Sequence, residues 1–210
     1  MKQENDRRPE MLQFLQPYME EQFQESCRKI QIEIEKNGHA IWAELKEILS
    51  ELFLCVNKMQ KQHKKGEIKY FVCSFLRYSL HLGRLEFYIH IMDEGFYLDE
   101  QEAGIYYCPQ FLQEAYLGDL NYLHKKAEEK FMRIQDYELF DVNEEYIESY
   151  YSIMYKMMES VSGQIMEVIA ESGILIADEF KIIYGEYMGN ATVLYAKGEC
   201  GDEILSDRNG

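Results

Sequence analysis

The chain has 210 residues and a formal net charge of −16, because its 38 acidic side chains outnumber its 22 basic ones. This excess of negative charge repels phosphate backbones and anionic membrane surfaces, which disfavours direct nucleic-acid binding. Hydrophobic residues make up 47% of the chain and aromatic residues 14%, a composition typical of folded proteins. No stretch approaches the ~20 apolar residues that span a bilayer, and no apolar leader follows the first residues. We therefore expect a cytoplasmic protein with no membrane association.

The cysteines and the short motifs of known enzymes give no sign of a bound metal or cofactor. The five cysteines are Cys27, Cys55, Cys73, Cys108 and Cys200, and no two of them form a Cys-x-x-Cys pair. This pattern argues against a disulfide framework and against a structural zinc site. The chain also lacks the glycine-rich nucleotide loops, the zinc-protease motif and the serine-hydrolase motif. We expect no cofactor.

The N-terminal part of the chain predicts two helices. Apolar residues recur at steps of three and four in 9–36 and again in 41–59. This is the spacing of an amphipathic helix. Asn37-Gly38, between the two segments, is a typical helix stop. We expect the two helices to pack against each other as a hairpin.

The middle of the chain changes to the two-residue period of strands. Residues 68–80 and 85–92 predict two strands joined by a short loop at 81–84. The first of these segments also fits a helix, and this alternative stays open. A third short strand is expected at 96–98, and an irregular segment at 100–109.

Two further helices and a second hairpin complete the prediction. One helix is expected at about 110–134, and another from Asp141, which has capping-box spacing with Glu144, to about residue 172. Residues 180–196 carry β-branched and aromatic residues around Gly189-Asn190, the signal of a hairpin. The sequence thus predicts an α+β fold, with a small antiparallel sheet of about five strands packed against about four amphipathic helices. We expect residues 1–197 to form a single domain and 198–210 a flexible polar tail.

The predicted pairing of the first hairpin divides it into an apolar side and a polar side. A loop at 81–84 places Leu80 opposite Leu85, and the side that carries this pair is apolar, as a core face should be. The other side gathers titratable, aromatic and hydroxyl groups. Its expected cross-strand pairs are Cys73 with Met92, Phe75 with His90, Arg77 with Tyr88, and Ser79 with Glu86.

Arg77, Glu86, Tyr88 and His90 form the candidate ligand-binding set on this polar side. Arg77 would hold a carboxylate or phosphate, and Glu86 or His90 would exchange protons. Glu186, in the second hairpin, is a candidate partner for Arg77 if the two hairpins are neighbours. The competing interpretation is an ordinary cross-strand ion pair between Arg77 and Glu86, with both rings partly covered by a helix.

The sequence leaves three hypotheses open for the function. The composition and the missing catalytic motifs favour a non-enzymatic binding or regulatory protein that acts through a protein partner or a small anionic ligand. The second hypothesis is an enzyme that uses the candidate set on a small anionic substrate, which requires a concave pocket and a perturbed pKa at His90 or Glu86. The third is a structural subunit whose long first helix pairs with another chain.

Overall fold

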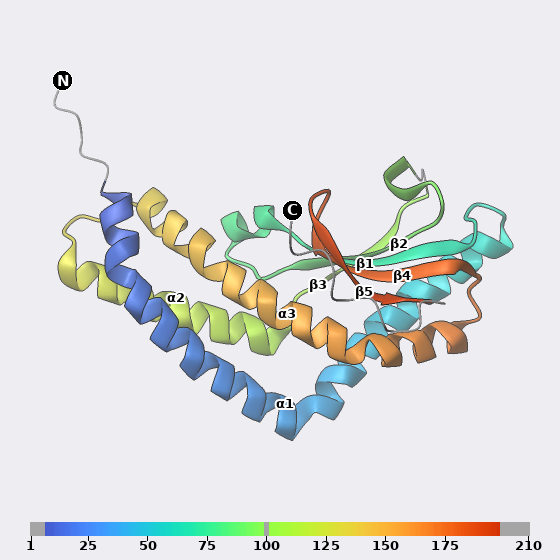
Figure 1. The fold of residues 1–210 in the computed structure, drawn as a ribbon, viewed down its shortest axis with the longest axis horizontal. Coiled ribbons are helices and arrows are strands. Elements are labelled where there is room, and N and C mark those ends of the chain that lie inside the picture. The colour runs from blue at the N-terminus through green and yellow to red at the C-terminus, as the bar shows by residue number, and fades with distance from the viewer. Residues whose placement is uncertain (1–6, 99–100, 198–210) are drawn as a thin grey trace, which may run out of the picture.

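Three α-helices and five strands make up the part of the chain that the structure describes, residues 7–98 and 101–197 (Figure 1). In this computed structural model the helices are α1 (Arg8–Lys61), α2 (Gln110–Lys130) and α3 (Asp136–Ser172). The strands are β1 (Ile68–Phe75), β2 (Phe87–Met92), β3 (Ala103–Tyr107), β4 (Ile176–Glu186) and β5 (Ala191–Ala196). Two short 3-10 helices, η1 (Arg77–Leu82) and η2 (Phe96–Leu98), follow β1 and β2. The predicted α+β class is confirmed, and the tail predicted at 198–210 lies outside the described residues.

The five strands form one sheet in the order β3-β2-β1-β4-β5. β1 pairs antiparallel with β2 and parallel with β4, so the sheet is mostly antiparallel, with one parallel pairing that the sequence pattern does not indicate. Parallel neighbours need a long crossover. Here β2, β3, α2 and α3 all lie between β1 and β4 in the chain. The hairpin predicted around Gly189-Asn190 is present as β4 and β5.

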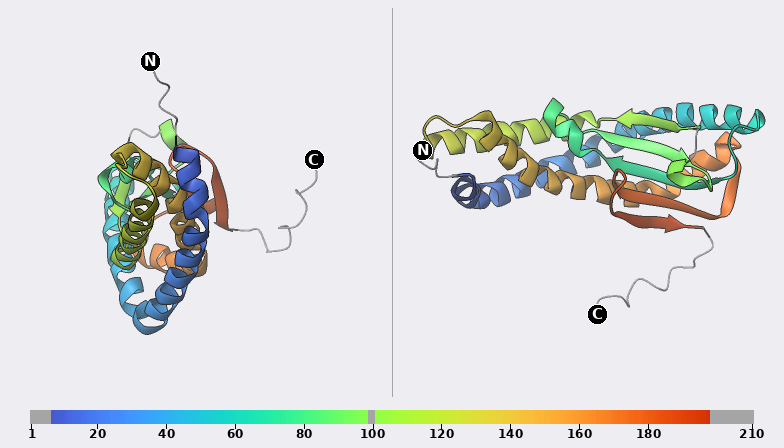
Figure 2. Two further views of the ribbon diagram at one scale, coloured as in Figure 1. Left: turned by 90° about the vertical axis from the view of Figure 1, so that its left-hand side faces the viewer. Right: turned by 90° about the horizontal axis from the view of Figure 1, so that it is seen from above.

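The long helices cover one face of the sheet. Phe71 and Phe75 of β1 and Phe87 and Ile89 of β2 pack on that face in one hydrophobic core with all three helices. Viewed from above, the strands lie in front of the long helices (Figure 2, right). We call the face turned toward this viewer the open face. No helix in the described ranges combines the length and the apolar character needed to cross a membrane.

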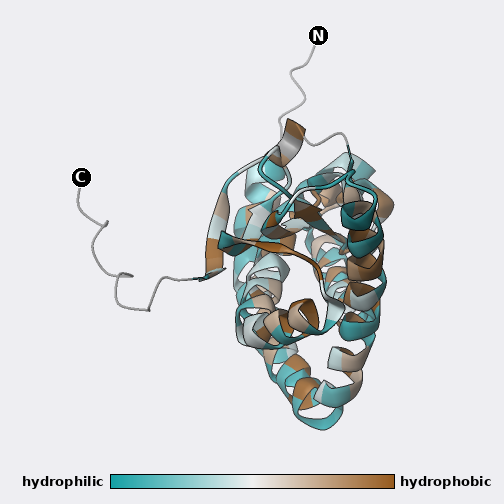
Figure 3. Ribbon diagram, turned by 90° about the vertical axis from the view of Figure 1, so that its right-hand side faces the viewer, coloured by the Kyte–Doolittle hydropathy of each residue, from teal (hydrophilic) through white to brown (hydrophobic). Residues whose placement is uncertain are grey.

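α1 is one continuous helix that bends near its middle (Figure 1). The stop predicted at Asn37-Gly38 is wrong, because both residues are helical, and the expected hairpin of two helices is absent. Ile30 and Leu45 are consecutive buried positions along this helix, so the stretch between them projects from the core. Figure 3 shows hydrophobic as well as hydrophilic residues at the bend, at the bottom of the view, where Ile32 is 47% exposed.

Other predicted boundaries shift as well. The strand expected at 96–98 is instead η2, and β3 lies within the segment expected to be irregular. α3 begins ahead of the expected Asp141, because Gln135 and Glu138 form the capping box. Glu138 also accepts hydrogen bonds of 2.7 and 2.9 Å from Arg7. This contact ties the start of α1 to the start of α3.

A buried carboxylate joins the three helices. Asp119 of α2 is 3% exposed and accepts hydrogen bonds from Gln22 (2.8 Å) and Ser26 (2.7 Å) of α1 and from Tyr146 and Tyr150 (both 2.7 Å) of α3. A buried charge is tolerated where donors of this kind replace the lost water. Burial, and next the hydrogen bond to Asp119, raises the pKa of both tyrosines, so their hydroxyls remain protonated donors.

Gly38→Ala tests whether the helix continues through the bend. A methyl group at Gly38 would meet only Ile34 Cγ2, at 4.0 Å. Alanine should therefore raise the free energy of unfolding by about 0.5–1 kcal/mol, because glycine is the weaker helix former. Gly173, which ends α3 with a φ of +69°, is the matched control, since alanine is strained there and should destabilise. If chemical denaturation shows that Gly38→Ala also destabilises, a helix end lies at Asn37-Gly38 after all.

Asp119→Ala tests the junction of the helices. The free energy of unfolding should fall by about 3–5 kcal/mol, because three buried hydroxyls lose their acceptor together. Tyr146→Phe removes one donor and keeps the other bonds, so it should cost only about 1 kcal/mol. Glu128→Ala, at an exposed position of α2, is the control in the same denaturation experiment. Equal effects of Asp119→Ala and Glu128→Ala would contradict the role given to this carboxylate.

Candidate functional site

The pairing of β1 with β2 decides which side chains reach the open face. Phe75 lies opposite Phe87, and Ser74 lies opposite Tyr88. The predicted pairing of Phe75 with His90 is therefore wrong by three residues. An odd shift moves every side chain of one strand to the other face. Phe75 lies in the core and Ser74 on the open face, whereas the two faces predicted for β2 are confirmed.

The connection between the two strands explains this difference. The chain leaves the sheet at Phe75, before the expected end at residue 80, and forms η1 instead of a tight loop. Gly83 then turns the chain with a φ of 62°. The Gln113 side chain of α2 holds the turn, because it accepts a hydrogen bond from Leu85 N at 2.6 Å and donates one to Gly83 O at 2.9 Å. Because Gln113 is distant in sequence from this turn, the local pattern of residues does not reveal its hydrogen bonds to Leu85 and Gly83.

Arg77 lies outside the sheet, in η1. Its guanidinium contacts Glu186 of β4 at 2.7 Å and Glu148 of α3 at 3.0 Å. The expected contact between Arg77 and Glu186 is therefore present. Two carboxylates already pair with this guanidinium, so it is not available to bind an anionic ligand.

Glu86 lies just before the start of β2 and pairs with Arg84. Its side chain is 17% exposed and is 3.6 Å from Arg84. The prediction that Arg77 and Glu86 share a sheet face is wrong, because Arg77 is not in a strand. Of the candidate set, the structure brings together Tyr88 and His90.

Tyr88 and His90 belong to a buried polar cluster on the open face. His90 is 3% exposed, and its Nε2 lies 3.2 Å from Ser74 Oγ. The Tyr88 ring stacks on the imidazole with 4.9 Å between centroids, and its hydroxyl donates to Glu102 at 2.7 Å. Gly104 of β3 makes room for this arrangement, because a Cβ there would lie 2.2 Å from the Tyr88 hydroxyl.

A pocket of about 210 Å³ lies over this cluster, and we call it the sheet-face pocket. Its lining residues are His90, Ile91, Met92, Phe96, Glu102, Ala103, Tyr187 and Met188. Phe96 belongs to η2 and Tyr187 to the turn between β4 and β5, and both segments rise above the sheet in Figure 1. The Tyr187 ring lies 5.8 Å from the His90 ring. The sheet thus forms the floor of the pocket, and two connections form its walls.

Sequence reasoning did not select Phe96, Glu102 or Tyr187 as site residues. Glu102 lies in the segment expected to be irregular, and Phe96 in a segment expected to be a strand. The one local signal is Gly104, because an isolated glycine in a strand often marks the close approach of another group.

Burial determines the charges around the pocket. It lowers the pKa of His90 to about 4, an effect that Glu102 opposes and Lys65 reinforces. Burial, and next the hydrogen bond to Glu102, raises the pKa of Tyr88. Near neutral pH the imidazole is therefore uncharged and the phenol is protonated. Apart from that imidazole, Glu102 is the one acidic or basic side chain among the described lining residues.

The stability of the protein should depend on the protonation of His90. Its pKa is about 4 in the folded chain and about 6.5 in the unfolded chain, so as the pH falls the unfolded chain binds this proton first. The stabilising contribution of the uncharged His90 is complete above about pH 6.5. It is lost as the pH falls toward 4, so the free energy of unfolding should decrease by about 2 kcal/mol between pH 7 and pH 5. Urea denaturation should show that His90→Gln removes this part of the pH dependence. His39→Gln, at an exposed position of α1, is the control, and equal slopes for all three proteins would contradict the assignment.

The function of the sheet-face pocket has to be inferred from its geometry. Within residues 7–98 and 101–197, no three His, Cys, Asp or Glu side chains are grouped so as to hold a metal ion. No family model, no curated protein and no solved structure matches this chain.

Proposed function

We propose that this chain is a non-enzymatic binding protein whose sheet-face pocket holds a small organic cation. The observation that carries the proposal is that Glu102 lines one small pocket together with the rings of Phe96 and Tyr187. Carboxylates attract cations by charge, and aromatic rings attract them through the negative potential of their faces. The net charge of −16 adds attraction at longer range.

The charge proposed for the ligand is the opposite of the one that the sequence pattern suggests. The expectation of an anion depended on Arg77, which lies beside Glu148 and Glu186 and outside the lining of the pocket. The pocket, at about 210 Å³, is also smaller than the roughly 300–1,000 Å³ of drug-sized sites. A compact amine or quaternary ammonium group suits this volume.

The ionisation of His90 supports binding of a cation rather than proton transfer. An imidazolium on the pocket floor would repel a cation, and the lowered pKa of His90 keeps the ring uncharged near neutral pH. A general acid or base works best when its pKa lies near the working pH. The pKa of His90 is lowered to about 4 and that of Tyr88 is raised, so both move away from that range. These shifts favour the binding hypothesis over the enzymatic one.

Calorimetric titration with three molecules of one shape tests the proposal. The probes are choline, its neutral analogue 3,3-dimethylbutan-1-ol, and the anion 3,3-dimethylbutanoate. Choline should bind about tenfold more tightly than the alcohol, because only choline has the charge that Glu102 and the rings attract. The anion should bind least. Glu102→Gln should remove the preference for choline.

Glu128→Gln is the matched control for this titration. It removes the same charge from an exposed position of α2, so it separates a local effect of Glu102 from a change in net charge. Tyr187→Leu should weaken choline and leave the alcohol nearly unchanged, because leucine keeps an apolar wall but has no ring. The proposal fails if choline does not bind, if the alcohol binds equally well, or if Glu128→Gln has the effect of Glu102→Gln.

A further inference from the structure

A second concave surface runs along α3 and consists of two hollows that share Ser152 and Lys156. One hollow, of about 390 Å³, lies between α1 and α3, and the other, of about 460 Å³, lies between α3 and the strands β4 and β5. Both volumes are in the usual range of small-molecule sites. We call the two hollows together the α3 groove. It shares no described lining residue with the sheet-face pocket.

The first hollow is mainly apolar, although Gln31 and Glu35 of α1 also line it. Its apolar lining residues are Phe23, Cys27, Ile30 and Ile34 of α1 and Ile153 and Met157 of α3. α1 and α3 diverge toward the bend of α1 (Figure 1), and these side chains line the hollow between the two helices. Covering such a surface with a hydrocarbon chain is favourable, at about 25 cal/mol per Å² of apolar area.

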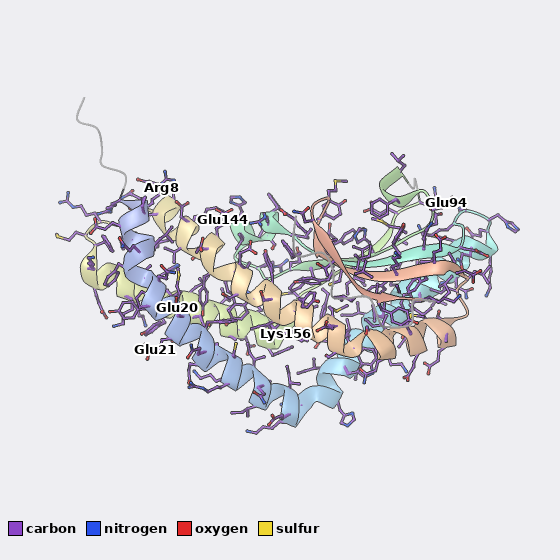
Figure 4. The ribbon with its side chains drawn as sticks, viewed as in Figure 1. Arg8, Glu20, Glu21, Glu94, Glu144 and Lys156 are labelled. Carbon is purple, nitrogen blue, oxygen red and sulfur yellow. The ribbon has the colours of Figure 1, made fainter. Side chains whose placement is uncertain are left out.

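Lys156 lies where the two hollows meet, and Figure 4 labels it near the middle of α3. It is the one basic side chain among the described residues that line the groove. In the described part of the chain it has no ion-pair or hydrogen-bond partner. Glu148, which lines the second hollow, is already paired with Arg77 at 3.0 Å. Lys156 is therefore available to an anionic group that enters the groove.

Tyr151 lines the second hollow and carries a buried hydroxyl. The residue is 3% exposed, and its hydroxyl has no hydrogen-bond partner among the described residues. The ring is fixed by stacking on Phe75, with 4.1 Å between centroids. Burial raises the pKa of Tyr151, so the hydroxyl remains a donor. A buried donor without an acceptor is costly, and an acceptor on a ligand would remove that cost.

We propose that the α3 groove binds one molecule of a free fatty acid. The hydrocarbon chain lies in the first hollow, and the carboxylate lies in the second, where Lys156 provides the positive charge and Tyr151 a hydroxyl donor. Lys156 is the only basic residue in the described lining and attracts an anionic head. Of the two acidic lining residues, Glu148 is paired with Arg77, and Glu35 accepts a hydrogen bond from Gln31 in the first hollow, away from the proposed place of the carboxylate. A single alkyl chain suits the first hollow better than a partner helix, which is roughly 10 Å across and would insert only a few side chains.

The test is calorimetric titration of the whole protein with decanoate, below its micelle-forming concentration, and with decan-1-ol. Decanoate should bind about tenfold more tightly, because the alcohol lacks the charge that pairs with Lys156. Lys156→Gln should abolish this difference, and Lys125→Gln, which removes the same charge from an exposed position of α2, should preserve it. Equal affinities of the two ligands, or equal losses in the two lysine variants, would overturn the proposal.

Three more variants distinguish fatty-acid binding in this groove from binding at the sheet-face pocket and from a dimer contact. Ile153→Trp should weaken both ligands by filling the first hollow. Tyr151→Phe should weaken decanoate severalfold without lowering the free energy of unfolding, which a purely structural hydroxyl would not do. Glu102→Gln should leave decanoate binding unchanged, so that a failure here is distinct from a failure at the sheet-face pocket. Unaltered decanoate binding by Ile153→Trp, or a dimer in sedimentation that this variant dissociates, would assign the groove to another role.

Discussion

Burial of the aromatic side of β1 governs the arrangement of the sheet. β1 is the central strand, and Phe71 and Phe75 lie against the helices. Because successive side chains of a strand point to opposite faces, this choice sends Val72 and Ser74 to the open face. His90, which lies opposite Val72, then meets Ser74 on the side that the long helices leave uncovered. The polar floor of the sheet-face pocket follows from the burial of two phenylalanines on the other side of the same strand.

α1 connects the two ends of the molecule. Its first half packs with α2 and α3 around Asp119, and its second half packs against the sheet, where the rings of Phe53 and Phe71 lie 6.3 Å apart. Because α1 bends, one half of it packs against the other helices and the other half packs against the sheet. The bend also opens the apolar end of the α3 groove. The two proposed sites differ in the charge that they present, since Glu102 lines one and Lys156 the other. One acidic chain can thus prefer a cation at one surface and an anion at another.

Elements with clean local periodicity could be predicted, and features that depend on distant contacts could not. β2 alternates apolar and polar residues, so both of its faces follow from the pattern. β1 carries apolar residues on both sides, so alternation does not fix its faces, and its pairing depends on the clamp that Gln113 provides from α2. Asn37-Gly38 favours a helix end locally, yet α1 continues because each half has its own packing partners. Of the site, Tyr88 and His90 were found by alternation, whereas Glu102 enters through one side-chain contact that no spacing rule reveals.

The parallel pairing of β1 with β4 has a consequence for how the protein is made. β1 ends at Phe75 and β4 begins at Ile176, so the centre of the sheet closes only after the intervening helices have folded back. Contacts so far apart in the chain carry a large loop-closure entropy and slow the search for the native state. While a ribosome is still producing α3, one edge of β1 has no strand to pair with, and an unpaired edge invites aggregation. The strong negative charge of the chain offers protection during this interval, because nascent copies repel one another.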